Sequence, residues 1–245
     1  MTRFKLTLEY DGGPYVGWQR QKNGPSVQAA LEAAARGFCG EDITVHGAGR
    51  TDAGVHALGQ VAHIDIPQDR DAATVLDALN HFLIDEPVVV LSAAVVGESF
   101  HARFSATGRL YRYRILNRRP RPGTTRGHVW WVPVPLDVKA MNDAAQELIG
   151  EHDFTSFRAT LCQAKSPVKT IDRLTVRQDG EEVVIEVSAR SFLHHQVRNI
   201  AGTLALVGKR KWSRQDVADA LAARSRASGG PTAPADGLYL VCVDY

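Results

Sequence analysis

The pattern of apolar and polar positions divides the first hundred residues into alternating strands and helices. Residues 3–10 alternate apolar Phe4, Leu6 and Leu8 with polar neighbours, which predicts a half-buried strand. The other elements expected here are a helix starting at Pro25-Ser26 with Ser26 as N-cap, a strand through Ile43 and Val45, a strand over 60–66, a helix over 72–83 and a strand over 88–96. This order of elements is that of a ferredoxin-like unit.

The second half of the chain is expected to be a looser copy of the first. The pattern predicts strands over 109–116, 129–132 and 238–245, a hairpin of 170–177 and 182–189 through Asp179-Gly180, and helices over 138–149, 193–207 and 215–223. We therefore expect an α+β fold with two ferredoxin-like or RRM-like α/β halves, residues 1–105 and 106–245. Their mainly antiparallel sheets are expected to join edge to edge, with an active-site cleft between the halves.

One stretch between two predicted strands carries an unusual set of residues. Residues 46–57 include three glycines, Arg50, Thr51 and a single carboxylate, Asp52. Glycines at this density let the backbone turn sharply and approach a ligand closely. Two interpretations are open here. Asp52 begins an ordinary turn and bonds its own backbone, or it is a buried carboxylate in a cleft, with Arg50 placed to handle a phosphate or a base.

The composition fits a globular protein of a reducing compartment. Hydrophobic residues make up 44% of the chain, and Cys39, Cys162 and Cys242 are far apart with no metal-ligand spacing. The chain starts directly with a predicted strand and has no apolar run near the ~18 residues of a membrane span. We therefore expect a cytoplasmic protein without a signal peptide or a membrane partner.

The positive charge is concentrated in one stretch, although the net charge of the whole chain is only +2. Between Ser99 and Leu136 there is no Asp or Glu, and aromatic residues lie among the basic ones. The basic residues are all arginine: Arg103, Arg109, Arg112, Arg114, Arg118, Arg119, Arg121 and Arg126. The planar guanidinium suits phosphate, and aromatic rings stack on unpaired bases, so the stretch predicts an RNA-binding surface. A solvated basic face is the alternative.

Two tyrosines of this stretch lie on one face of the strand predicted over 109–116. Tyr111 and Tyr113 are two positions apart, so both side chains point the same way. One tyrosine is expected to line a pocket. For each, the alternative is packing in the core with the hydroxyl hydrogen-bonded.

The stretch 191–202 combines two histidines with an arginine. On the predicted helix Arg198 follows His194 by four positions, so both are expected on one face. A buried arginine needs a carboxylate partner, and Asp52 is the partner we expect. Metal ligation by His194 and His195 is not expected, because adjacent residues of a helix face different directions.

A set of motifs spread in order over nearly the whole chain resembles the tRNA pseudouridine synthase A family. The motifs are residues 10–12 with 17–21, then 49–57, 100–103, 109–113, 152–157, 192–199 and 233–240. A short Arg-Thr-Asp motif alone would be a weak signal, but the set in this order is specific.

The resemblance implies the pseudouridine synthase fold and a cofactor-free isomerase that binds no metal. Its substrate would be tRNA, in which uridine becomes pseudouridine at positions 38, 39 and 40 of the anticodon stem-loop. It also implies a homodimer in which tRNA contacts both subunits. By the same resemblance Asp52 is the nucleophile, Arg50 helps to flip out and replace the target base, Tyr111 stacks on that base, and Arg198 pairs with Asp52.

Two other functions are weighed against this one. The first is a tRNA-binding module without catalysis. The second is a metal-dependent hydrolase that uses Asp52 and His56 with His46 or His63, for which no second carboxylate stands at ligand spacing.

Overall fold

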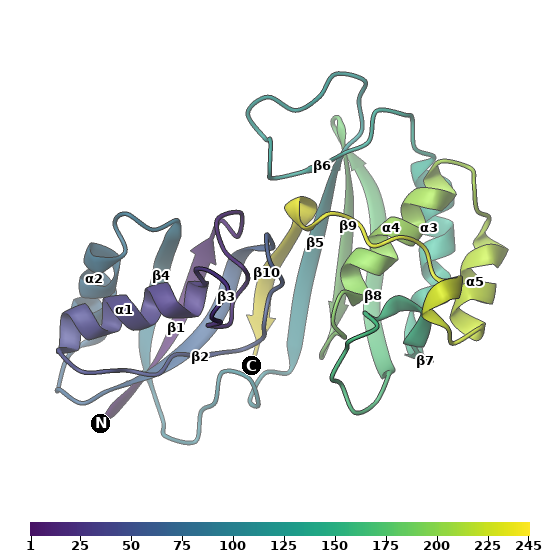
Figure 1. Cartoon of the computed structure of the whole chain (residues 1–245). Helices are drawn as coiled ribbons and strands as arrows, with labels where there is room; N and C mark the ends of the chain where they lie inside the picture. The colour runs from purple at the N-terminus through teal and green to yellow at the C-terminus, as the bar shows by residue number, and fades with distance from the viewer. The chain divides into compact units, whose positions relative to one another are not determined.

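The computed structural model describes residues 1–245 and consists of two compact units. Unit 1 comprises Met1–Thr107 and Tyr239–Tyr245, and unit 2 comprises Gly108–Leu238. The last strand, β10 (Leu238–Asp244, yellow in Figure 1), therefore lies mostly in unit 1, whereas the sequence pattern placed it in the second half. The reason is a parallel pairing with a strand far away in the sequence, Tyr239 opposite His56 and Leu240 opposite Ala57, which no local pattern encodes.

Unit 1 has the predicted ferredoxin-like order of elements. In chain order they are β1 (Thr2–Tyr10), α1 (Val27–Cys39), β2 (His46–Gly47), β3 (His56–Ile66), α2 (Ala72–Phe82) and β4 (Val88–Val96). The strands lie in the order β4-β1-β3, and both β2 and β10 pair with β3. All pairings except that of β10 with β3 are antiparallel.

Local chemistry explains where the helices of unit 1 begin. Ser26 caps α1 by accepting a hydrogen bond from Ala29 N, and Asp71 caps α2 in the same way from Thr74 N. The alternate residues Phe4, Leu6 and Leu8 of β1 are fully buried, while their polar neighbours are not. The predicted N-cap and the buried face of β1 are thus confirmed.

The predicted strand through Ile43 and Val45 is wrong. Both side chains are buried, but only His46–Gly47 forms a strand. The backbone groups of Val45 are instead taken by side chains of α1: Glu32 Oε1 accepts from Val45 N (3.3 Å), and Gln28 Nε2 donates to Val45 O (3.0 Å). With these groups satisfied by side chains, the segment does not need a sheet partner.

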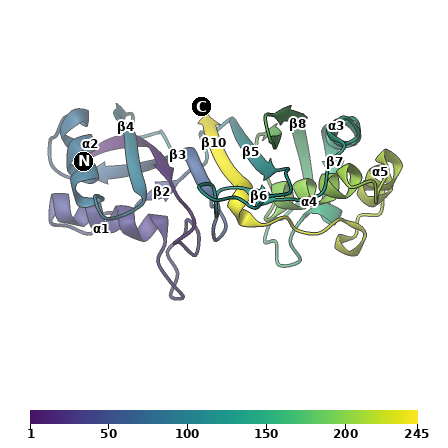
Figure 2. The ribbon, with the colours of Figure 1, turned by 90° about the horizontal axis from the view of Figure 1, so that it is seen from above.

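Unit 2 is also an α+β unit with a mostly antiparallel sheet. Its elements are β5 (Gly108–Leu116), β6 (Trp130–Trp131), α3 (Val138–Ala145), a 3₁₀ turn (Gln146–Leu148), β7 (Gly150–Asp153), β8 (Val168–Asp179), β9 (Glu182–Ala189), α4 (Gln196–Gly208) and α5 (Arg214–Ala222). The strands lie in the order β5-β9-β8-β7, with the short β6 parallel to β5. Figure 2 shows the three helices grouped beside β7 and β8.

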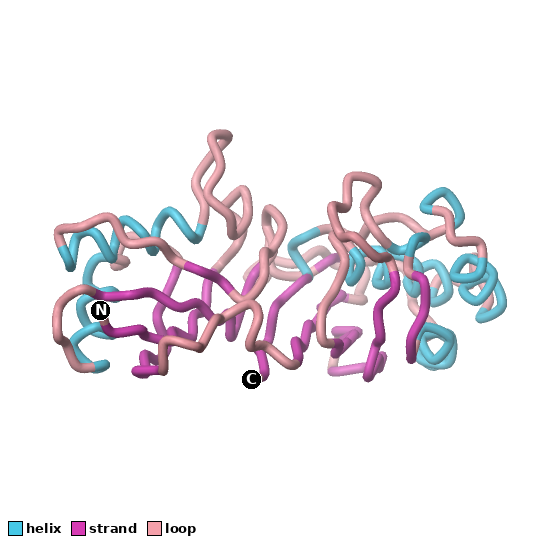
Figure 3. Tube along the Cα trace, turned by 90° about the horizontal axis from the view of Figure 1, so that it is seen from below, coloured by secondary structure: helices cyan, strands magenta, loops and turns pink.

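The hairpin of β8 and β9 is confirmed, with Gly180 in the left-handed region at φ 58°. The short strand β7 was not predicted, because its four residues, Gly-Glu-His-Asp, contain no apolar side chain and so no alternation of apolar and polar positions. In Figure 3 long loops (pink) extend beyond the ends of the strands (magenta).

The prediction that His194 and Arg198 share one helix face is wrong. Helix α4 begins at Gln196, and its N-cap His195 has φ 62°, a left-handed conformation that a continuing helix does not allow. The side chain of Gln196 accepts a hydrogen bond from Leu193 N (2.8 Å), which fixes this bend before the helix. His194 therefore lies outside the helix.

None of the five α-helices combines the length and the apolar character that crossing a lipid bilayer requires.

Candidate active site

Asp52 begins a tight turn in unit 1. Val55 N donates to Asp52 O (3.1 Å), and Gly54 adopts φ 75° at the position of the turn that requires a left-handed residue. The interpretation as a turn is therefore correct for the backbone. The side chain of Asp52 is half-buried rather than buried. The turn involves only the backbone of Asp52, so it does not assign a role to the carboxylate.

The segment around Tyr10–Trp18 holds this turn in place. Buried Thr51 has its hydroxyl 2.8 Å from Tyr10 Oη, and its carbonyl accepts from Trp18 N (3.0 Å). Gly54 N donates to Tyr15 O (3.3 Å). Burial raises the pKa of Tyr10 to about 12, so this phenol stays neutral and can serve as a fixed hydrogen-bonding group. A loop fixed on both sides of Asp52 suits a carboxylate that must be held in one place.

Gly17 is a point where the two loops approach closely. It has φ 115°, and a Cβ at this position would lie 2.7 Å from Thr51 O. We expect Gly17→Ala to destabilise the protein by about 2–3 kcal/mol, because it adds both backbone strain and a clash with backbone. This corresponds to a fall in Tm of about 5–10 °C in thermal unfolding.

The neighbouring Gly13→Ala is the matched control for this experiment. A Cβ at Gly13 would meet only the side chain of Asp11, at 3.1 Å, and Gly13 has no positive φ. If Tm is the same as in the wild type for both variants, the two loops are not tightly packed at Gly17 and the prediction is wrong.

Arg50 precedes Asp52 on the same loop. Its side chain is exposed and forms no salt bridge, so the guanidinium is available to a ligand. This position is compatible with the base-displacing role predicted for it, which stays a prediction.

The structure separates the two tyrosines of β5. Tyr113 is completely buried, its hydroxyl donates to Pro234 O (2.8 Å), and burial raises its pKa. Tyr111 is only half-buried, and its ring meets Phe192 edge-on at 5.2 Å. Of the two, only Tyr111 retains ring surface that a base can reach, so Tyr113 follows the core-packing alternative.

Arg198 lies in the first turn of α4 and is held by the chain that follows α5. Arg198 Nε donates to Ala233 O (2.8 Å), and Ala233 N donates to Arg198 O (3.1 Å). Arg198 belongs to unit 2 and Asp52 to unit 1, so their pairing stays a prediction.

A buried polar network that the sequence did not reveal supports this end of α4. Asn199 donates to Phe157 O (2.8 Å) and accepts from Thr232 Oγ1 (2.6 Å). Buried Ser156 accepts from Ser225 N (2.9 Å). Asn199 and Ser156 lie inside the family motifs, and a polar residue beside the apolar stripe of a helix is the signal that could have pointed to Asn199.

Carboxylates engage part of the predicted RNA-binding surface. The salt bridges are Arg112–Glu186 (2.8 Å), Arg114–Glu182 (2.7 Å) and Arg118–Glu181 (2.6 Å). Arg109 donates to the carbonyl of Arg190. The stretch lacks acids in sequence, but the antiparallel strand β9 and the turn before it supply them.

The other predicted arginines are more available to phosphate. Arg119, Arg121 and Arg126 are exposed in the loop after β5 and form no salt bridge. Arg103 is also exposed and lies 5.7 Å from the Phe104 ring centroid. The geometry favours Arg119, Arg121 and Arg126 over the paired arginines, and the RNA-binding role of all eight stays a prediction.

Three histidines of unit 1, His46, His63 and His101, lie together and test the metal-site alternative. His63 Nδ1 accepts a hydrogen bond from Ala102 N (3.1 Å), and His101 Nδ1 accepts one from Arg103 N (3.1 Å). Burial and the adjacent imidazoles lower the pKa of His63 to about 4, so it is neutral at pH 7. A neutral imidazole that accepts at Nδ1 carries its proton on Nε2 and has no remaining lone pair for a metal. The cluster is therefore arranged for hydrogen bonding.

Comparison with known proteins identifies the family. The family model described as tRNA pseudouridine synthase matches residues 7–105 and 144–245, which include the Asp52 turn and Arg198. A tRNA pseudouridine synthase A of Nitrobacter hamburgensis is 59% identical over 245 residues, all of both chains. The enzyme of that name from Paramagnetospirillum magneticum is 58% identical over 100% of this chain and 96% of its own. The one from Rhodospirillum centenum is 60% identical over 98% of each chain. This chain belongs to the tRNA pseudouridine synthase family.

Proposed function

We propose that this protein is an isomerase that converts uridine to pseudouridine at positions 38, 39 and 40 of the tRNA anticodon stem-loop. Asp52 is the nucleophile and no cofactor takes part. The observation that carries the proposal is the identity of 58% over all 245 residues with a relative named tRNA pseudouridine synthase A. We further propose that it acts as a cytoplasmic homodimer, with tRNA contacting both subunits.

The reaction is an isomerisation, which adds no atom to the substrate. The enzyme therefore has to position the reacting groups of the nucleoside. The bond between the base nitrogen and C1′ of the ribose breaks, the base rotates, and C1′ bonds to C5 of the same base, which loses its proton to solvent while the nitrogen gains one. Three roles are chemically open to the carboxylate of Asp52: attack on C1′, attack on the base, or removal of the C2′ proton.

The proposed mechanism gives each functional residue one role. Arg198 pairs with Asp52 and stabilises its negative charge. A target base within a stem must first leave the stack, which costs a few kcal/mol. Exposed Arg50 enters the vacated space, and the accessible ring of Tyr111 stacks on the extruded base.

The direct test uses tRNA transcripts labelled with tritium at C5 of uridine. We expect one equivalent of tritium to be released for each uridine at positions 38–40, in the presence of a chelator as well as in its absence. Transcripts with cytidine at these three positions are the control and should release none.

Each alternative function predicts a different result in this assay. A tRNA-binding module binds the transcript but releases no tritium, and a metal-dependent enzyme stops when the chelator is added. Release from transcripts that lack uridine at 38–40 would contradict the proposed positions but not the proposed chemistry.

A further inference from the structure

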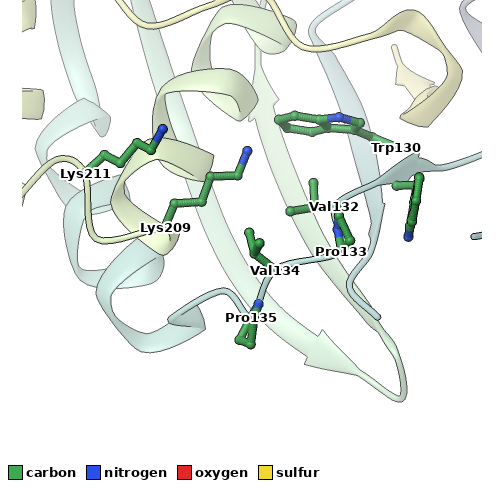
Figure 4. A pocket seen from close by; sticks show the side chains of 8 residues that line it. Trp130, Val132, Pro133, Val134, Pro135, Lys209 and Lys211 are labelled. Atoms are coloured by element: carbon green, nitrogen blue, oxygen red, sulfur yellow. The ribbon is translucent and has the colours of Figure 1, made fainter. Parts of the chain in front are cut away.

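A hollow of about 470 Å³ lies on unit 2, away from the proposed site residues. Residues 130–135 form one wall, and Lys209 and Lys211, directly after α4, form the other (Figure 4). Its volume is in the range of pockets that bind small ligands. The hollow plays no part in the proposed isomerisation, so a separate role has to be considered.

The apolar wall is anchored to the sheet. Trp130 lies opposite Ile115 in the β5–β6 pairing, and its ring meets the buried Tyr113 ring edge-on at 6.1 Å. Val132 N donates to Leu116 O (2.9 Å). A wall fixed in this way does not have to be ordered when a ligand binds, which lowers the cost of binding.

The two lysines are cations without a carboxylate partner. Lys209 Nζ lies 5.4 Å from the Trp130 ring centroid, and Figure 4 shows it pointing towards that ring. Burial lowers the pKa of Lys209, and the charge of Lys211 lowers it further. Neither lysine forms a salt bridge, so an anion between them would relieve their repulsion.

Asp137, two residues after the apolar wall, is an acidic group that already has partners. Asp137 Oδ1 accepts from Ala140 N (3.1 Å) as the N-cap of α3, and its Oδ2 lies 3.4 Å from Arg210. Its backbone N–H donates to Gly208 O (2.9 Å), so it sits beside the end of α4. The protein places this carboxylate next to the hollow but pairs it with Arg210.

We propose that the hollow binds one nucleotide of the substrate tRNA, other than the one that is isomerised. Its phosphodiester lies between the ammonium groups of Lys209 and Lys211, and its base or sugar packs against Trp130 and the apolar wall. Lysine is a common phosphate ligand, and base stacking on an aromatic ring is worth about 1–3 kcal/mol. The inference rests on the proposed function, since it takes tRNA as the substrate.

The position of the hollow within unit 2 indicates how far this nucleotide lies from the one that is isomerised. Arg198 in the first turn of α4 and Lys209, the C-cap of α4, are separated by eleven positions, about 16 Å at the helical rise of 1.5 Å per residue. Tyr111 and Ile115, the partner of Trp130, are about 13 Å apart along β5. The nucleotide is therefore several positions away from the uridine at Tyr111.

The test compares Lys209→Gln/Lys211→Gln with the wild-type protein, using full-length chain and unmodified tRNA transcript. We expect Kd for tRNA to rise about tenfold and the slope of log K against log salt to fall by about 1. Turnover at saturating tRNA should stay within about twofold, because the hollow does not touch the reacting nucleoside. Lys209→Arg/Lys211→Arg should restore most of the affinity.

The charge-matched control is Lys139→Gln/Lys165→Gln, which removes two exposed lysines that do not line the hollow. An unchanged Kd and salt slope in the hollow variant would overturn the inference. So would a change only in Tm, since the lysines would then merely stabilise the end of α4. The single variant Lys211→Gln keeps the test valid if Lys209 is needed for folding, because Lys211 is exposed.

Two further outcomes separate this inference from others. If the variant changes the oligomeric state but not the tRNA affinity, the hollow contacts protein and the inference is wrong. If the wild-type protein releases no tritium from any tRNA, the proposed function fails, whatever the variant does. If the wild-type protein releases tritium but the variant binds tRNA as tightly as wild type, only the inference about the hollow is overturned.

Discussion

Asp52→Asn is expected to lower tritium release from tRNA at least about 1,000-fold, while Kd for tRNA changes by no more than about threefold. The amide has nearly the shape of the carboxylate but neither its charge nor its nucleophilicity. Loss of the reacting group in comparable enzymes costs more than this, and 1,000-fold corresponds to about 4 kcal/mol of activation free energy. The turn itself should survive, because the bond from Val55 N goes to the backbone carbonyl of Asp52.

Two further variants make this prediction specific. Asp69→Asn removes an exposed carboxylate elsewhere in unit 1 and should leave release unchanged. Asp52→Glu keeps the charge but displaces it by one methylene group, and we expect it to lose at least about 100-fold, because misplacement by about 1 Å can cost that much. Undiminished release by Asp52→Asn would refute the proposed mechanism.

The elements that the sequence predicted well share one property. In β1 and over residues 185–189 of β9, the alternation of apolar and polar residues coincides with one buried face. In α1 the N-cap Ser26 and the apolar face agree with each other. Where local preference and burial point to the same structure, the pattern is sufficient.

The predictions that failed depend on partners distant in the sequence or on an unusual backbone conformation. Ile43 and Val45 are as apolar as a strand, but side chains of α1 take the backbone groups of Val45. His195 is helix-compatible in pattern, but it adopts φ 62°. β10 pairs with β3 in unit 1, across more than half of the chain. Periodicity contains no information on any of these.

The arginine-rich stretch shows the same limit for charge. A run without acids predicts a free basic surface only if no acid comes from a neighbouring strand. Antiparallel pairing sets Arg112 opposite Glu186, and Arg114 reaches Glu182 through two hydrogen bonds. The free cations are instead in the loop after β5 and in the two lysines after α4, which the sequence did not single out.

The candidate site shows which roles sequence similarity can and cannot supply. The motifs named Asp52, Arg50, Tyr111 and Arg198 directly. The supports of these residues, such as the bonds of Thr51 to Tyr10 and Trp18, come only from the structure. These supports explain why glycine and aromatic residues far from Asp52 in the sequence are needed to position it.

Tyr111→Ala is expected to lower turnover about 10- to 100-fold with little change in stability. The loss corresponds to about 1–3 kcal/mol, the range measured for stacking of a base on an aromatic ring. The stability should hold because Tyr111 is only half-buried and its ring contacts Phe192 at one edge. Tyr111→Phe keeps the ring, so it should keep most of the activity if stacking is the role, and lose it if the hydroxyl transfers a proton.

Tyr113→Ala should do the reverse. Tyr113 is fully buried and its hydroxyl bonds to Pro234 O, so truncation is expected to cost about 3–5 kcal/mol of folding free energy and about 6–20 °C in Tm. Tyr113→Phe, which removes only the hydroxyl, should cost about 1 kcal/mol. Turnover per folded molecule in the two alanine variants is the deciding measurement, made below both Tm values. Equal losses would mean that Tyr111 does not hold the base, because a residue that only packs the core changes the amount of folded enzyme and not its rate.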